Sequence, residues 1–240
     1  MRTVVITGAN RGLGLALARA LLGRGDRVVA TCRRPDDAAS LRAMLEPAGD
    51  DALLLPLDVT DPRSAAAVAS TVDETMGGVD LLINNAGVWA APDADPAASA
   101  GPLAALEADA LTDVLRINAV GALMTTQAFV ALLARTGGGV VANVSSGLGS
   151  VARDAPKRAY GYAMSKAALN MATQHLAAEL VDRGVGVVAI DPGWVRTDLG
   201  GERARLTADE AASGILGVLD DLAPETTGAF LNRHGELVPW

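Results

Sequence analysis

A tyrosine and a lysine four residues apart are the pair in this 240-residue sequence best suited to moving a proton. Tyr162 and Lys166 bound the stretch Tyr162-Ala163-Met164-Ser165-Lys166. Residues four apart share one face of a helix, so the Lys166 ammonium is expected beside the phenol. A free phenol has a pKa of about 10, and a neighbouring cation lowers that value by favouring the phenolate. The pair therefore predicts acid–base chemistry, although each residue alone would more often be a packing tyrosine or a surface lysine.

A glycine-rich turn follows the first apolar segment of the chain. Its residues are Thr7-Gly8-Ala9-Asn10-Arg11-Gly12-Leu13-Gly14. Gly8 permits a tight turn, Gly12 lets the backbone approach a pyrophosphate at a helix N-terminus, and Gly14 leaves room where a helix and a strand touch. Because the turn stands after a strand and before an amphipathic helix, it predicts a dinucleotide site; elsewhere it would be an ordinary glycine turn.

The end of the second apolar segment indicates which dinucleotide binds. NAD sites usually place an acid about 20 residues beyond the glycines, where it binds the ribose 2′-hydroxyl. This sequence has Arg33 and Arg34 there, and Arg11 within the glycine turn. Guanidinium groups bind phosphate in bidentate fashion, so we expect NADP(H) to be preferred over NAD(H), through Arg11 and Arg33. The alternative is that these are solvated surface arginines.

Short apolar segments alternate with longer helical stretches. Most of the predicted strands lack period-two alternation, which is typical of strands covered on both faces. The predicted strands are Thr3–Thr7, Arg27–Thr31, Ala52–Leu57, Val79–Asn84, Val140–Ser145, Gly184–Ile190 and Ala229–Asn232. The predicted helices are Leu13–Gly23, Asp36–Leu45, Pro62–Met76, Leu103–Leu133, Arg158–Asp182 and Thr207–Leu222. This order predicts an α/β fold in which a doubly wound, mostly parallel sheet of seven strands has helices on both faces. We expect residues 1–240 to form one domain.

Two stretches without helical periodicity, Trp89–Pro102 and Gly147–Lys157, follow predicted strand ends. Ligands of open α/β sheets bind at the carboxyl ends of the strands, so both stretches should border the site. Trp89 and Trp194 are expected to be apolar walls of a substrate pocket; the alternative is a core or interface role for each tryptophan.

Composition and charge limit the partners. The net charge of −8 argues against nucleic acid and anionic membranes, which require clustered basic residues. Cys32 is the only cysteine, and His175 and His234 lack metal-ligand spacing, so no metal site is expected. The first apolar segment is too short for a signal peptide, and no run reaches the roughly 18 apolar residues of a membrane span. We expect a cytoplasmic protein with a small-molecule substrate.

Seven motifs between Thr7 and Thr197 resemble, in order, those of the short-chain dehydrogenase/reductase family. Beside the glycine turn they are Leu57-Asp58-Val59-Thr60, Asn84-Asn85-Ala86-Gly87, Arg116-Ile117-Asn118-Ala119, Ser145-Ser146-Gly147-Leu148-Gly149, Tyr162-Ala163-Met164-Ser165-Lys166 and Pro192-Gly193-Trp194-Val195-Arg196-Thr197. The tail Gly235–Trp240 is similar to that of the C-factor-like and sniffer-type carbonyl reductases. The resemblance implies a Rossmann fold and hydride transfer between NADP(H) and a carbonyl/alcohol pair.

The resemblance also implies roles for four catalytic residues. Tyr162 would be the general acid and base, and Lys166 would also bind the nicotinamide ribose. Ser146 would hold the substrate oxygen and stabilise the developing alkoxide. Asn118 would interrupt its helix and hold a water that extends a proton relay from Lys166.

Two near neighbours compete with these assignments. Ser146 is preferred over Ser145 because Gly149 then lies where the motif expects it, and Tyr160 is rejected because Met164 follows it at the position of the lysine.

The resemblance also implies a set of residues that would bind the cofactor. They are Gly8, Asn10, Arg11, Gly12, Leu13, Gly14, Arg33, Asp58, Val59, Asn85, Ala86, Gly87, Tyr162, Lys166, Pro192, Gly193, Val195 and Thr197.

Ser146 and Tyr162 are 16 residues apart, which is more than in many members of that family. The extra length falls in Val151–Ala159, a loop expected to lean over the substrate.

Small residues on the helix after Tyr162 suggest a homodimer, although packing on the chain's own sheet would explain most of them. Two rival functions are a different reaction on the same scaffold and a non-enzymatic NADPH-binding regulator or redox sensor; the presence of both Tyr162 and Lys166 disfavours the regulator.

Overall fold

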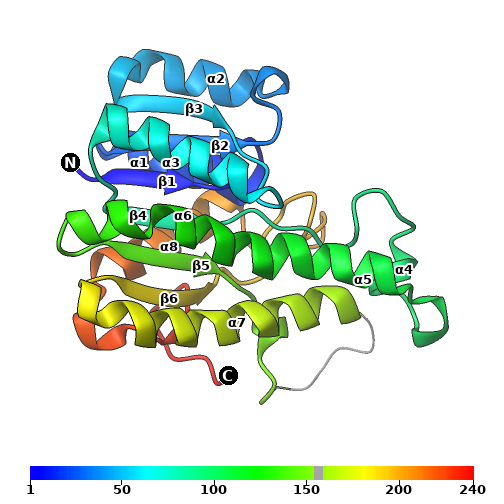
Figure 1. Cartoon of the computed structure of the whole chain (residues 1–240). Helices are drawn as coiled ribbons and strands as arrows, with labels where there is room; N and C mark the ends of the chain where they lie inside the picture. The colour runs from blue at the N-terminus through cyan, green and yellow to red at the C-terminus, as the bar shows by residue number, and fades with distance from the viewer. Residues whose placement is uncertain (154–158) are drawn as a thin grey trace.

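Seven strands form one sheet in the order β3-β2-β1-β4-β5-β6-β7 (Figure 1). The computed structural model describes residues 1–153 and 159–240. Its strands are β1 (Thr3–Ile6), β2 (Arg27–Cys32), β3 (Ala52–Pro56), β4 (Leu81–Asn84), β5 (Val140–Val144), β6 (Gly186–Asp191) and β7 (Phe230–Asn232). Every pair of neighbouring strands is parallel. The predicted doubly wound sheet of seven strands is confirmed.

The helices connect these strands in the predicted places. They are α1 (Gly12–Gly23), α2 (Ala39–Leu45), α3 (Pro62–Met76), α4 (Ala97–Ala100), α5 (Ala108–Leu115), α6 (Gly121–Arg135), α7 (Tyr160–Leu180) and α8 (Ala208–Asp220). Two expectations need correction. The stretch Leu103–Leu133 is not one helix, because a π-helical turn at Arg116–Val120 separates α5 from α6. The stretch Trp89–Pro102 is not all loop, since it contains α4. The predicted helix start at Arg158 lies outside the described residues.

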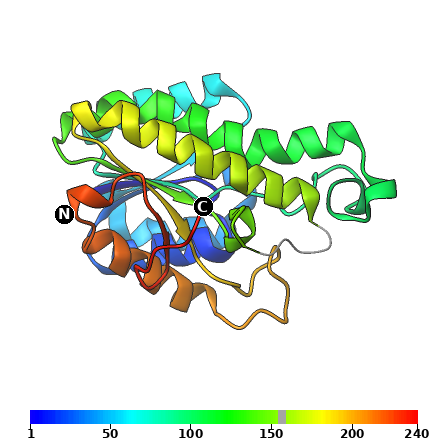
Figure 2. The same ribbon diagram turned by 90° about the horizontal axis from the view of Figure 1, so that it is seen from below.

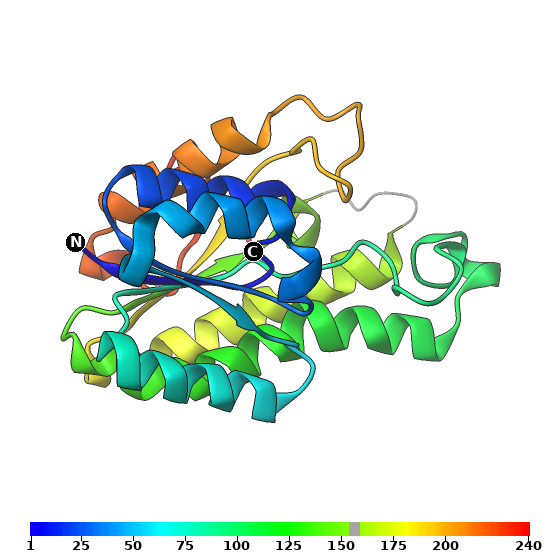
Figure 3. The ribbon, with the colours of Figure 1, turned by 90° about the horizontal axis from the view of Figure 1, so that it is seen from above.

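The sheet is covered on both faces (Figures 2 and 3). Side chains of α1, α2 and α8 pack in one apolar cluster, and side chains of α3, α6 and α7 pack in a second. Successive strand residues point to opposite faces; in β1, Val4 and Ile6 belong to the first cluster and Val5 to the second. Since both faces are buried, both need apolar residues, which is why the strands lack period-two alternation.

The stretch Ala108–Arg135 is long and apolar enough, by length and composition, to cross a membrane, which the sequence expectation missed. In the fold it lies against the sheet and its neighbouring helices, and half of its most apolar window is buried. Phe129 and Leu133 of α6 are fully buried in the second apolar cluster. The apolar residues of this stretch are therefore explained by its packing against the sheet.

The chain reverses its direction across the sheet between β1 and β4. From β1 it builds outward through β2 and β3, and then it crosses back to β4 and builds outward on the other side. At such a switch point the loops after the two central strands diverge and leave a crevice. The glycine turn follows β1, and the Asn85–Gly87 segment follows β4, so the topology brings both motifs to the same crevice.

Candidate active site

A cavity of about 1010 Å³ opens at the carboxyl ends of the strands. All of the predicted catalytic, cofactor-binding and substrate-pocket residues line it, with the exception of Asn118. The glycine turn, the end of β2 and the Leu57–Thr60 segment lie on one side of the site. Ser146 lies in the segment after β5, and Tyr162 and Lys166 belong to α7. The fold therefore brings together motifs that are separated by up to about 190 residues in the sequence.

The glycine turn has the shape of a phosphate cradle. Gly8 has φ of +66°, a conformation that side chains rarely adopt, and a Cβ on Gly14 would collide with the carbonyl oxygen of Gly8. The Asn85 side-chain amide donates to the carbonyl oxygens of Thr7 (2.8 Å) and Gly8 (3.1 Å), which ties the turn to the loop after β4. In the described part of the chain no side chain caps α1, which begins at Gly12. Its first N–H groups therefore suit an anion such as a pyrophosphate.

The three arginines near the turn are in different situations. Arg11 is exposed and forms an ion pair with Asp198 (2.9 Å). Arg34 does not line the cavity and pairs with Asp37 (3.0 Å). Arg33 is exposed at the cavity wall after β2, and the ion pairs among the described residues do not include it. Its guanidinium is thus available to a phosphate at this end of the cavity.

Tyr162 and Lys166 lie one turn apart on the cavity side of α7, and both are buried. The Lys166 Nζ is 5.7 Å from the centre of the Tyr162 ring and donates to the carbonyl oxygen of Val144 at the end of β5 (2.7 Å). The Ser146 hydroxyl lies near the phenol of Tyr162 and acts to lower its pKa. The serine Oγ also accepts the backbone N–H of Leu148 (3.2 Å), which fixes its direction. The phenol, the hydroxyl and the ammonium therefore converge on one place.

Burial sets the pKa values of this pair. Loss of solvent raises the pKa of Tyr162 to about 12; the hydrogen bond from Ser146 lowers it in part, and the Asp191 carboxylate raises it further. Burial lowers the pKa of Lys166 to about 8. The expectation that the ammonium lowers the phenol pKa is thus corrected: burial is the largest cause of the shift, and Lys166 is not among the groups that change this pKa. At neutral pH the phenol is protonated and the lysine is charged.

Comparison with known proteins fits this geometry. The sequence pattern described as short chain dehydrogenase matches residues 2–207. The chain belongs to the short-chain dehydrogenase family. It is 32% identical to 1-hydroxy-2-glutathionyl-2-methyl-3-butene dehydrogenase of Rhodococcus sp. (strain AD45), and the match covers 100% of both chains.

Solved structures of carbonyl reductases overlay closely on this one. The carbonyl reductase Sniffer of D. melanogaster has a TM-score of 0.92 and 29% identity, covering 100% of both chains. The NADPH-bound carbonyl reductase from chicken fatty liver has a TM-score of 0.88 and 35% identity, covering 100% of this chain and 99% of the other. The resemblance to sniffer-type enzymes is confirmed.

Asn118 lies behind the cavity wall of this short-chain dehydrogenase. Its Oδ1 accepts the N–H of Val88 (2.8 Å), and its Nδ2 donates to the Val88 carbonyl (2.8 Å) and to Ser165 Oγ (2.9 Å). A Cβ on Gly87 would lie 3.3 Å from Asn118 Oδ1 and 3.7 Å from Lys166 Nζ, so the asparagine and the ammonium flank the same spot. The expected helix interruption is the π-helical turn at Arg116–Val120. The water assigned to Asn118 stays a prediction.

The two predicted wall residues differ. The rings of Trp89 and Tyr162 are 5.0 Å apart between centroids and tilted by 34°, so Trp89 packs directly on the phenol. Trp194 is exposed, and its Nε1 donates to the carbonyl oxygen of Gly200 (2.7 Å), which fixes the ring at the cavity mouth. Trp89 thus lies beside the Tyr162 phenol, whereas Trp194 lies at the entrance.

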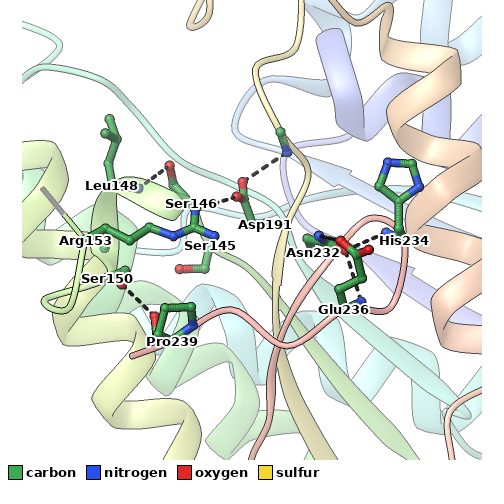
Figure 4. A network of polar contacts seen from close by, with 12 residues as sticks. Ser145, Ser146, Leu148, Ser150, Arg153, Asp191, Asn232, His234, Glu236 and Pro239 are labelled. Atoms are coloured by element: carbon green, nitrogen blue, oxygen red, sulfur yellow. Dashed lines mark hydrogen bonds and ion pairs between the residues drawn. The ribbon is translucent and has the colours of Figure 1, made fainter.

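Sequence reasoning missed two charged residues of the site, Asp191 and Arg153. Asp191 ends β6; its Oδ1 accepts the N–H of Gly193 (3.0 Å), and its Oδ2 lies 4.0 Å from Arg153 Nη1 (Figure 4). Its place directly before the Pro192-Gly193 motif was a signal that could have identified it. Arg153 belongs to the longer loop after Ser146, and no spacing singles it out. Of that loop, Val151–Ala159, residues 154–158 lie outside the described part of the chain.

Proposed function

We propose that this chain is an NADPH-dependent carbonyl reductase in which Tyr162 protonates the substrate oxygen. One observation carries the proposal: the Tyr162 phenol, the Ser146 hydroxyl and the Lys166 ammonium converge in a cavity that continues to the uncapped N-terminus of α1. A carbonyl being reduced needs these three groups, namely a proton donor, a hydrogen-bond donor for the developing alkoxide, and a cation.

Each residue has one task in the proposed reaction. The nicotinamide, when bound, supplies or accepts the hydride. The Ser146 hydroxyl holds the substrate oxygen, and the Tyr162 O–H donates its proton to that oxygen. With a pKa of about 12, the phenol is in the form that can donate at neutral pH. The Lys166 ammonium stabilises the phenolate left behind, and Asn118 would hold the water through which a proton returns.

The cofactor would lie across the switch point. The first turn of α1 would bind the pyrophosphate, Asp58 the adenine, and the loops after β4 and β6 the nicotinamide half. Arg33, with help from Arg11, would bind the 2′-phosphate. The NADPH-bound neighbour from chicken supports this choice of dinucleotide.

Cofactor choice can be tested at two adjacent arginines. Arg33→Ala should raise KM for NADPH by about 10- to 100-fold, since one charge-assisted bidentate contact is lost, and it should leave NADH kinetics unchanged within about twofold. Arg34→Ala is the matched control, because Arg34 does not line the cavity. Comparable wild-type efficiency with NADH and NADPH would contradict the proposed preference.

The substrate class is tested by NADPH oxidation. The neighbours named as carbonyl reductases, and a relative whose name describes an alcohol dehydrogenase, support a carbonyl/alcohol pair. A panel of ketones, aldehydes and quinones should contain compounds that consume NADPH in the presence of the protein. A protein that binds NADPH and reduces none of them would instead be a non-enzymatic NADPH-binding protein.

We also propose that the protein is cytoplasmic and forms a homodimer through α7. Met164 and Met171, seven residues apart on this helix, are 48% and 56% exposed, so they offer apolar surface that a second copy could cover. Sedimentation equilibrium should give twice the chain mass, and Met171→Glu should shift it toward the monomer. A monomeric wild type at micromolar concentration would contradict the proposed dimer.

A further inference from the structure

A guanidinium lies beside the predicted catalytic serine and takes no part in the proposed reaction. Arg153 lines the same cavity as Ser146 and Tyr162. A Cβ built on Gly147, the residue after Ser146, would lie 2.6 Å from Arg153 Nη1 and 3.0 Å from Asp191 Oδ2. The absence of a side chain at Gly147 therefore lets the guanidinium approach the backbone next to the serine.

The charge of Arg153 is only partly balanced. Among the described residues its ion-pair partner is Asp191, at 4.0 Å, which is too long for a hydrogen bond. Asp191 Oδ1 already accepts the N–H of Gly193. The Arg153 side chain is 45% exposed, while that of Asp191 is 16% exposed. A guanidinium has five N–H donors in a planar fork, so an edge of this group remains available to a ligand in the cavity.

The segment that carries Arg153 is fixed by the end of the chain. Ser150 Oγ donates to the carbonyl oxygen of Pro239 (2.6 Å), and the Ala152 N–H donates to that of Trp240 (2.8 Å). The Trp240 ring stacks on Phe230 of β7, with centroids 5.4 Å apart. Figure 4 shows Ser150 held by Pro239 while the Arg153 side chain points toward Asp191. Such preorganisation reduces the entropy that an arginine loses when it binds a ligand.

The other arginines that line the described cavity have different surroundings. Arg11 pairs with Asp198, and Arg33 lies at the end of β2. Arg116 donates to the Thr60 carbonyl oxygen (3.3 Å). Arg153 is therefore the arginine positioned beside Ser146.

We propose that Arg153 binds a carboxylate of the substrate, so that the preferred substrates are carbonyl compounds that carry a carboxylate group. This inference rests on the proposed reductase function, because it names the substrate class of that same site. The carbonyl would lie at Ser146 and Tyr162, and the carboxylate would face the open edge of the guanidinium. The contact with Asp191 would orient the guanidinium and leave N–H donors of Arg153 free to bind the carboxylate.

The test compares acids with their methyl esters. The substrates are 4-formylbenzoate and 4-oxopentanoate, each assayed with NADPH against its methyl ester. Arg153→Met should lower kcat/KM for the acids by about 10- to 100-fold, mainly through KM, the usual range for a lost charge-assisted contact. The esters should change by less than about twofold. Arg153→Lys should recover part of the loss, and Arg183→Met, which is exposed after the C-terminus of α7 and does not line the cavity, should match the wild type.

Calorimetry of benzoate binding to the NADPH complex separates this inference from the reductase assignment. We expect Arg153→Met to weaken benzoate binding by about tenfold or more. If acids and esters lose activity equally, or benzoate binds the variant as well as the wild type, the carboxylate site is wrong while the reductase stands. If NADPH is never oxidised yet benzoate binding depends on Arg153, the reductase assignment is wrong and the anion site remains.

Discussion

Tyr162 and Lys166 respond to burial in opposite ways. Desolvation favours the neutral form of each group, so the pKa of the phenol rises to about 12 and that of the ammonium falls to about 8. Between pH 8 and pH 12 both side chains are neutral. Below pH 8 the lysine is charged while the phenol is still protonated. That lower range suits proton donation to a carbonyl oxygen.

The buried lysine predicts a pH-dependent stability. Above pH 8 the folded chain releases the Lys166 proton, while the unfolded chain keeps it up to pH 10.5, so the unfolded state binds more protons and stability rises with pH. Between pH 7 and 9.5 the wild type should gain about 2 kcal/mol of unfolding free energy relative to Lys166→Met. Urea denaturation of both proteins at the two pH values measures this difference.

Other groups that titrate in this range cancel in the comparison, because both proteins contain them. A constant difference between the wild type and Lys166→Met across this pH range would show that the lysine is not desolvated as the structure indicates.

At the residue scale, the sequence predicts which motif residues gather at the cavity, but it does not predict the loop residues beside them. The spacing of Tyr162 and Lys166 reflects one helical turn, and the glycines reflect backbone constraints, so both can be interpreted locally. Arg153 and Asp191 meet only because the segment after β5 folds back over the end of β6. The shift of the Tyr162 pKa was also missed, since its burial depends on packing that no spacing encodes.

At the scale of elements, α8 depends on a capping box. The Thr207 Oγ1 accepts the N–H of Glu210 (3.2 Å), and the Glu210 carboxylate accepts the N–H of Thr207 (2.8 Å). Thr207→Ala should lower the unfolding free energy by about 1 kcal/mol and Tm by roughly 2–4 °C. Differential scanning calorimetry measures the shift. Thr207→Ser keeps the hydroxyl and should stay near the wild type; an equal loss in both variants would exclude the cap as the cause.

Helix ends were predictable where local residues determine them. For α3, the predicted bounds Pro62–Met76 match the structure, because Asp61 caps the first turn and Gly77 ends the helix with φ of +79°. Periodicity alone did not predict the break between α5 and α6, because the π-helical turn accompanies hydrogen bonds between Asn118 and Val88, 30 residues away. Contacts of that kind are decided by the tertiary fold.

At the scale of the whole molecule, strand and helix alternation was enough to predict the sheet. Strands that are apolar on both faces must be covered by helices on both sides of the sheet. This requirement predicts three layers, with the sheet between two layers of helices. The shape of the substrate end was not predictable, because it is formed by loops after three different strands, one of which is held by the tail at Pro239 and Trp240. Each of these segments is irregular, and only the assembled fold brings them together.

The assembled cavity predicts a ligand-dependent stability. We expect the 240 residues to unfold in one transition whose Tm rises by about 5–10 °C with NADPH at 100 times its Kd, from a stabilisation of about 2.7 kcal/mol. The same concentration of NADH should give a smaller rise, because it lacks the phosphate for Arg33. Thermal denaturation followed by circular dichroism measures both shifts. Two separate transitions would argue against one domain, and equal shifts would argue against the role of Arg33.

The central claim is that the Tyr162 phenol protonates the substrate, and turnover of Tyr162→Phe with NADPH tests it most directly. The variant keeps the ring against Trp89 and loses only the hydroxyl. We predict that kcat falls by roughly 10²- to 10⁴-fold, while the Kd for NADPH, measured by its fluorescence, stays within about twofold of the wild type. If Tyr162→Phe binds NADPH and reduces the carbonyl at the wild-type rate, Tyr162 is not the proton donor.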